Sequence, residues 1–185
     1  MTGVGIMDCK AALKKADGDL EEAQKILREQ GLNLLAHKDK DGLQGRVEAY
    51  LHHNGTLGVL VEISCQTDFA ANSAEFREVA RDMAMHIAAC HPRYITTEDV
   101  PETVRETERE IYRKQIEKES KPAEIVEKIV EGRLNKFYEQ VCLLNQPFVK
   151  DPGKTIAEVL SELRAKMNEI ITIKRFVRFE IGTED

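Results

Sequence analysis

The sequence has no tryptophan, and aromatic residues make up only 5% of it. Proteins that hold single-stranded nucleic acid usually offer a platform of stacking rings, which this composition does not supply. Basic residues are also in the minority, because 27 Lys and Arg face 33 Asp and Glu, for a formal net charge of −6. General nucleic-acid binders are usually basic, so we expect no direct nucleic-acid partner.

Long apolar runs and paired cysteines are absent as well. No stretch approaches the roughly 18 apolar residues that a membrane span needs, and the N-terminus shows no basic-then-apolar signal region. The four cysteines are Cys9, Cys65, Cys90 and Cys142. None of them forms the CxxC pair of a zinc ribbon or a thioredoxin-like site. We therefore expect a cytoplasmic protein that does not interact with a membrane.

Common catalytic motifs are missing too, including G-x-S-x-G and a Gly-rich phosphate loop. Two clusters leave a chemical alternative open. Asp82, His86 and Cys90 are spaced for one helix face and could ligate a metal, although Cys90 is more simply a buried structural thiol. Cys65 and His52 could form a nucleophilic pair, or Cys65 could be the last inward residue of a strand. We expect no cofactor, no metal and no enzymatic activity.

The patterns that are present predict one domain with a small helical appendage. A length of 185 residues suits one domain, or one domain plus an appendage. Residues 4–31 show two helical patterns separated by Gly18, and Asp19 with Glu22 has the spacing of a helix N-cap. We assign residues 1–36 to a helical head, 37–44 to a charged linker and 45–185 to an α+β core.

A β-hairpin is the clearest feature of the predicted core. Over residues 46–65, apolar and polar side chains alternate on both sides of Asn54-Gly55, a dipeptide that suits a tight hairpin turn. The return strand is expected to place one apolar set on the inner face: Leu57, Val59, Val61, Ile63 and Cys65. Residues 66–73 are interpreted as a polar loop, and residues 74–90 as an amphipathic helix.

Three further helices and a last strand complete the predicted core. Helical patterns cover residues 102–119, 122–141 and 156–167, and the wide apolar stripe of the second predicts a helical hairpin with the first. The last strand, residues 171–181, is expected to place one set of side chains on a single face, all apolar except Arg175: Ile171, Ile173, Val177, Phe179 and Ile181. These elements predict an α+β fold with a three-stranded antiparallel sheet. Its two free edges favour pairing with another chain.

Thr67-Asp68-Phe69 is the segment that composition does not explain. Phe69 is an aromatic residue in an otherwise polar loop, with Asp68 beside it and the small residues Ala70 and Ala71 after it. The ring either folds back onto its own core or is offered to a partner, with a carboxylate next to it.

At this segment the sequence resembles a known family. Residues 2–13 read TGVGIMDCKAAL and resemble the N-terminal signature of elongation factor Ts, and residues 65–69 read CQTDF and resemble its central motif. Three further blocks are similar to the same family, namely 129–134 (IVEGRL), 146–149 (QPFV) and 178–180 (RFE). Separated blocks in the right order make this resemblance much more specific than a single motif.

The resemblance implies a ubiquitin-associated-like head, here without its first helix, joined to an α+β core. It implies a guanine nucleotide exchange factor for the GTPase elongation factor Tu, which promotes GDP release by inserting Asp68 and Phe69 near the bound magnesium. The partner-binding residues that it implies are Thr67, Asp68, Phe69, Ile6, Met7, Lys10, His86 and Val149. The chain is similar to the short form with one core, so we also expect a homodimer.

Two other functions remain open at this stage. The head could recognise a ubiquitin-like or other helical partner without any nucleotide exchange. A cysteine such as Cys65 or Cys90 could instead be a nucleophile, which requires a thiol whose pKa is lowered. Ala70 stands where the family frequently has valine, so the segment beside Phe69 is expected to pack less firmly.

Overall fold

The computed structural model describes residues 6–20, 22–23, 25–27, 44–116 and 122–183, without the side chains of Ile6 and Asp8. The chain divides into two compact units, one of residues 1–88 with 158–185 and one of residues 89–157. The predicted linker lies outside the described residues except for Gln44, which begins the first strand. The division into head, linker and core therefore stays a prediction.

The N-terminal segment contains the two expected helices. The first, α1, spans Ile6–Lys15, and the described positions from 20 to 27 are helical again. Between them, Asp17 and Gly18 adopt positive φ angles of 47° and 91°, which turn the chain. The Asp19 carboxylate accepts a 3.0 Å hydrogen bond from the backbone N–H of Glu22, so the predicted N-cap is confirmed.

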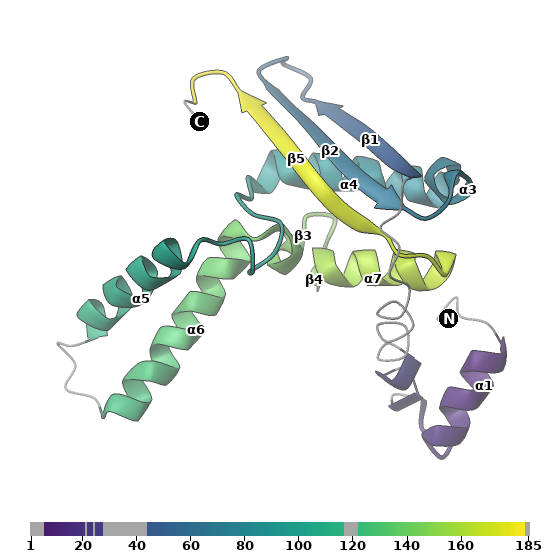
Figure 1. Ribbon diagram of the computed structural model, residues 1–185, viewed down its shortest axis with the longest axis horizontal. Coiled ribbons are helices and arrows are strands. Elements are labelled where there is room, and N and C mark those ends of the chain that lie inside the picture. Colours follow the sequence, from purple (N-terminus) through teal and green to yellow (C-terminus); the bar gives the residue numbers. More distant parts are fainter. Residues whose placement is uncertain (1–5, 21, 24, 28–43, 117–121, 184–185) are drawn as a thin grey trace. The chain divides into compact units, whose positions relative to one another are not determined.

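A three-stranded antiparallel sheet forms the centre of the first unit (Figure 1). Its strands are β1 (Gln44–Leu51), β2 (Leu57–Cys65) and β5 (Thr172–Glu180), in the order β1-β2-β5. The turn between β1 and β2 uses Gly55 at a φ of 71°, and the N–H of Gly55 donates to His52 O at 2.8 Å. The predicted hairpin and α+β fold are confirmed.

One face of the sheet is covered by the long helix α4, which spans Ala74–Cys90 and runs behind the strands in Figure 1. The inward residues of β2 are the predicted ones, and Val59, Val61, Ile63 and Cys65 are all buried. The helix contributes side chains that are fully buried, namely Phe76, Ala80, Met83 and Ile87. The pattern of apolar residues at helical spacing thus identified this core face correctly.

The prediction that β5 has a single apolar face is wrong. Ile63 pairs with Ile173 and Glu62 pairs with Arg175, so Lys174 is an extra residue that forms a β-bulge. Side chains along a strand alternate between the two faces of the sheet, so one extra residue switches the face to which each following side chain points. Before the bulge, Ile171 and Ile173 point to the core. After it, Val177 and Phe179 point away from the core.

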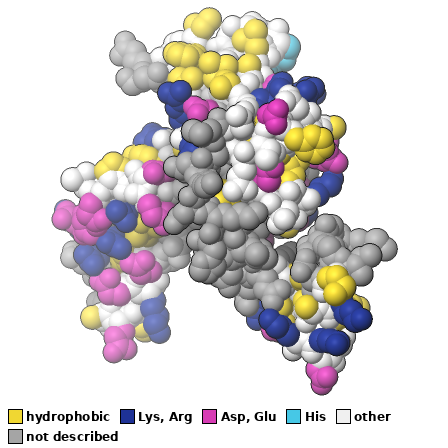
Figure 2. Space-filling view, turned by 45° about the vertical axis from the view of Figure 1, so that its right-hand side comes forward, with side chains coloured by type: hydrophobic (Ala, Val, Ile, Leu, Met, Phe, Trp, Pro, Cys, Tyr) yellow, Lys and Arg dark blue, Asp and Glu magenta, His cyan; other side chains and the backbone are white. Residues whose placement is uncertain are grey.

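The other face of the sheet exposes apolar side chains beside the Glu62–Arg175 ion pair, and no element among the described residues covers them. The register of the three strands places five exposed apolar residues on this face, which we call the open face: Val47, Leu51, Leu60, Val177 and Phe179. Phe179 is 63% exposed and Leu51 72% exposed. Figure 2 shows hydrophobic side chains gathered at the upper end of the molecule, over the end of the sheet that carries the hairpin turn.

The helix α7 spans Ile156–Met167 and buries Ile156, Leu160 and Leu163, as its sequence pattern predicts. A two-stranded ribbon precedes it, formed by β3 (Pro147–Phe148) and β4 (Asp151–Thr155). This ribbon was not predicted, because strands of two and five residues with little apolar alternation give no period-two signal.

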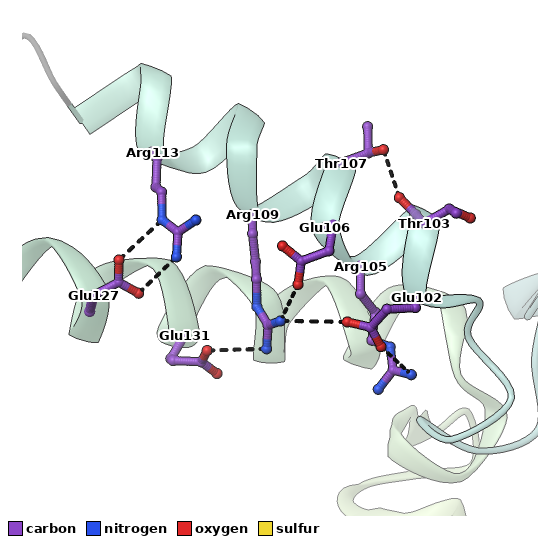
Figure 3. Close-up of polar contacts among 9 residues, drawn as sticks. All are labelled: Glu102, Thr103, Arg105, Glu106, Thr107, Arg109, Arg113, Glu127 and Glu131. Carbon is purple, nitrogen blue, oxygen red and sulfur yellow. Dashed lines mark hydrogen bonds and ion pairs between the residues drawn. The ribbon is translucent and has the colours of Figure 1, made fainter.

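The second unit contains the predicted helical hairpin of α5 (Glu102–Ile116) and α6 (Ala123–Val141). Ile116, Val130 and Leu134 are buried, and ion pairs line the hairpin (Figure 3). Arg109 contacts Glu106 at 2.6 Å and Glu131 at 3.5 Å, and Arg113 binds both oxygens of Glu127. Exposed ion pairs of this kind contribute only about 0.2–1 kcal/mol each, so apolar burial stabilises the hairpin more. None of the helices within the described ranges is long and apolar enough to cross a membrane.

We expect Gly45→Ala to destabilise the β1–β2 hairpin. A methyl group at this position would overlap the carbonyl oxygen of Ile63 and lie 2.9 Å from the Cα atom of Ser64. Overpacking of this kind costs about 1–3 kcal/mol, so the free energy of unfolding measured in urea should fall by that amount. Gly58→Ala is the matched control, because its methyl group would lie 3.7 Å from Leu51 Cδ1 in ordinary contact. Equal stability of the two variants would contradict the close approach of the strands.

Candidate functional site

The predicted polar loop after β2 contains a short helix, α3, which spans Asp68–Asn72. Thr67 is its N-cap: the residue has extended backbone angles, and its hydroxyl oxygen accepts a hydrogen bond from the N–H of Ala70 at 3.1 Å. At the other end the N–H of Ser73 donates to Ala70 O at 3.0 Å, and the Ser73 hydroxyl oxygen accepts from the N–H of Phe76 at 3.2 Å. The segment is therefore an ordered turn of helix between β2 and α4.

This short helix separates its small residues from its large one. Ala70 and Ala71 are each 5% exposed and anchor the helix, whereas Phe69 is 84% exposed and Asp68 is exposed beside it. The alternative in which the ring folds back onto its own core is therefore wrong for this structure. A large ring held out on an anchored helix has the form of an apolar anchor for a partner.

Glu169 holds the strand end that leads into α3, and sequence reasoning missed it. Its Oε2 atom accepts hydrogen bonds from the N–H groups of Gln66 at 3.0 Å and Thr67 at 3.3 Å, and its Oε1 atom accepts from the Thr67 hydroxyl at 2.5 Å. Glu169 lies between α7 and β5, about a hundred positions from its partners. No local pattern marks such a contact.

The remaining predicted contact residues lie on other elements. Met7 is 76% exposed and Lys10 is exposed on α1, while Val149 is 42% exposed between β3 and β4 in the second unit. The side chain of Ile6 lies outside the described residues. His86 is fully buried on α4, so the chain by itself does not present this residue at its surface. The structure thus brings together Thr67, Asp68 and Phe69 on a single turn.

Cys65, Cys90 and Cys142 do not have the environment of nucleophiles. Burial, and then the negative charge of Glu169, raises the pKa of the Cys65 thiol, and desolvation raises that of Cys90. Burial raises the pKa of Cys142 to about 11. Reactive cysteines have lowered pKa values instead. The nucleophilic alternative therefore lacks its physical requirement.

The two candidate clusters of the sequence are not assembled either. His52 lies opposite Leu57, the first residue of the nine-residue strand β2, and Cys65 is the last residue of that strand, so the two are roughly 25 Å apart along it. Asp82, His86 and Cys90 do not form a metal-binding group, and across the part of the chain that the structure describes no three such side chains do. The expectation that Cys90 is buried is wrong, because it ends α4 at an exposed position.

Comparison with known proteins agrees with the sequence blocks. The family model described as Elongation factor TS matches residues 10–183. A protein named Elongation factor Ts from Carboxydothermus hydrogenoformans is 56% identical over 182 residues, which cover 98% of this chain and 84% of the relative. Proteins of the same name are 52% identical in Caldanaerobacter subterraneus subsp. tengcongensis and 50% identical in Pseudothermotoga lettingae. The matches cover 98% and 100% of this chain, and 91% and 93% of those relatives.

The thiol environments predict slow alkylation of the folded chain at pH 8. Among Cys65, Cys90 and Cys142, Cys90 should react first because it is exposed, but more slowly than free cysteine because its pKa is raised. Cys65 and Cys142 should react only after unfolding, since both are buried. Mass spectrometry of peptides after timed exposure to iodoacetamide measures each rate. Alkylation of Cys65 or Cys90 faster than that of free cysteine would contradict the assigned environments.

Proposed function

Because the chain belongs to the elongation factor Ts family, we propose that it is a guanine nucleotide exchange factor for elongation factor Tu in translation elongation. We also propose that it works in the cytoplasm. The observation that carries the proposal for the site is the exposure of Phe69, at 84%, on a helix whose two ends are both capped. The proposed exchange requires no covalent step on this chain.

We propose that α3 inserts Phe69 and Asp68 near the magnesium and nucleotide site of the GTPase. The octahedral shell of Mg²⁺ tolerates little distortion, so a small displacement of its surroundings weakens the hold on nucleotide. Asp68 precedes Phe69 in the first turn of α3, so we propose that its exposed carboxylate brings a negative charge to the same region of the GTPase. Thr67 contributes by capping the helix that carries both residues.

The exchange follows from thermodynamic coupling. A protein that binds the nucleotide-free GTPase more tightly than the GDP-bound form weakens GDP binding by the same factor. Burying a phenylalanine side chain stabilises a complex by about 1.5–3 kcal/mol, which corresponds to roughly 10- to 150-fold in a binding constant. A ring that is buried only when the nucleotide site is open therefore supplies a useful part of the coupling.

Residues outside α3 are proposed to add affinity. Met7 and Lys10 are exposed on α1 and, together with Ile6, form the proposed contact of the head with the same GTPase. Val149 is an exposed apolar residue of the second unit and is proposed as a further contact. His86 stays a prediction from the family resemblance, and its burial in the chain does not support a direct surface contact.

A homodimer is the proposed state of the free protein. The open face exposes Val47, Leu51, Leu60, Val177 and Phe179 on one side of the sheet. Monomeric proteins rarely leave such contiguous apolar surface in water, and two sheets pack face to face about 10 Å apart in sandwiches. We propose that two copies bury their open faces against each other.

Phe69→Ala and Asp68→Ala are expected to slow exchange. Catalytic amounts of the unaltered chain should speed the release of labelled GDP from elongation factor Tu, and removal of the ring should reduce that acceleration roughly 10- to 150-fold. The control is Ile125→Ala, which removes another partly exposed apolar side chain, on α6, and should leave the rate unchanged. Unchanged GDP release in both site variants would disprove the role of α3.

Leu60→Lys is expected to convert the dimer to a monomer, because it places a charge in the middle of the open face. Sedimentation equilibrium should give twice 21.0 kDa for the unaltered chain and 21.0 kDa for the variant. Ile125→Lys serves as the control, since it adds the same charge on α6 and should keep the larger mass. A monomeric unaltered chain at micromolar concentration would refute the proposed packing.

A further inference from the structure

The carboxylate of Glu169 uses both of its oxygens on two consecutive residues. It accepts from the N–H of Gln66, the N–H of Thr67 and the hydroxyl of Thr67, at distances from 2.5 to 3.3 Å. Pairing between β1 and β2 ends at Gln44 and Cys65, so these two N–H groups lie past the end of that ladder. Glu169 supplies hydrogen-bond acceptors to these two N–H groups, for which the β1–β2 ladder has no acceptor.

The same contact determines how Thr67 caps α3. A hydroxyl group has one hydrogen to donate and lone pairs that accept. Because the Thr67 hydroxyl donates to Glu169, its oxygen faces the N–H of Ala70 as an acceptor. The carboxylate therefore orients the cap, and the cap sets the direction in which the first turn of α3 projects Phe69 and Asp68.

The backbone position of Glu169 is fixed by residues that precede and follow it in the chain. Asn168 precedes it with a positive φ of 54°, which ends α7 and reverses the chain. The Arg164 Nε–H donates to Ile171 O at 2.6 Å and ties α7 to the segment that enters β5. Leu160 and Leu163 are buried and anchor α7 in the core. The carboxylate thus projects from a turn that is braced against the same core that carries α3.

From this geometry we infer that Glu169 is a positioning residue for nucleotide exchange, which holds α3 in the orientation that presents Phe69 and Asp68. The inference rests on the proposed function. Glu169 acts through Thr67 and is not itself offered to the partner. Loss of a preorganised orientation is costly because the partner must then order the segment on binding, and small misplacements of a positioned group change rates by roughly 10- to 100-fold.

The test compares Glu169→Ala and Glu169→Gln with the unaltered chain. Glutamine keeps the size of the side chain but replaces one acceptor oxygen with an NH₂ group, which cannot accept from an N–H or a hydroxyl group. Labelled GDP release from elongation factor Tu is measured over a range of factor concentrations, and hydrogen exchange of residues 66–73 is measured on the chain alone. The control is Lys166→Ala, which breaks the ion pair with Glu75 and leaves the contacts of Thr67 in place.

We expect Glu169→Ala to slow GDP release roughly 10- to 100-fold and to speed hydrogen exchange in residues 66–73, with Glu169→Gln showing a smaller change of both. Lys166→Ala should change neither. The effects of Glu169→Ala and Phe69→Ala on GDP release should be less than additive, because Glu169 positions only Asp68 once the ring is absent. A general loss of folding stability would instead slow GDP release by the same factor with and without the Phe69 ring.

The outcomes separate this inference from the function on which it rests. An unaltered chain that speeds GDP release, combined with an equally active Glu169→Ala variant, overturns the positioning role alone. Slowing by the same factor with and without the Phe69 ring, or unchanged hydrogen exchange in residues 66–73, also overturns it. An unaltered chain that does not speed GDP release overturns the proposed function and this role together.

Discussion

The hydroxyl group of Thr67 connects the core of the protein to its candidate site. It donates to the Glu169 carboxylate on one side and accepts from the first turn of α3 on the other, so the direction of that helix depends on a residue from a distant part of the chain. Polar groups on a short exposed helix would otherwise compete with water for each hydrogen bond. With this bridge in place, a helix of only five residues can hold a large ring in solvent.

The arrangement also explains how an exposed aromatic residue is tolerated. Phe69 gains little burial on folding, so the energy that keeps α3 in place has to come from other residues. Ala70 and Ala71 pack inward, and the caps at Thr67 and Ser73 satisfy the backbone groups of both helix ends. The apolar surface of the ring is thereby left available to a partner, which is the property that an exchange factor needs.

A second apolar surface arises from the alternation of the sheet. The bulge at Lys174 reverses the faces of β5, and this reversal moves Val177 and Phe179 to the side away from α4. Together with Val47, Leu51 and Leu60 they form the open face. The two apolar surfaces thus have different origins, because one is a single ring on a capped turn and the other is a continuous patch produced by strand register.

The amino-acid sequence by itself determined the α-helices other than α3, the β1–β2 hairpin, the inward face of β2 and the family, because these depend on local periodicity, turn chemistry and contiguous motifs. It also identified Thr67, Asp68 and Phe69 as unusual, but it left the direction of the ring open. Only the tertiary structure decided that Phe69 points outward, that Glu169 holds Thr67, and that β5 changes face at Lys174. These features depend on contacts between residues far apart in the chain, and local patterns carry no record of such contacts.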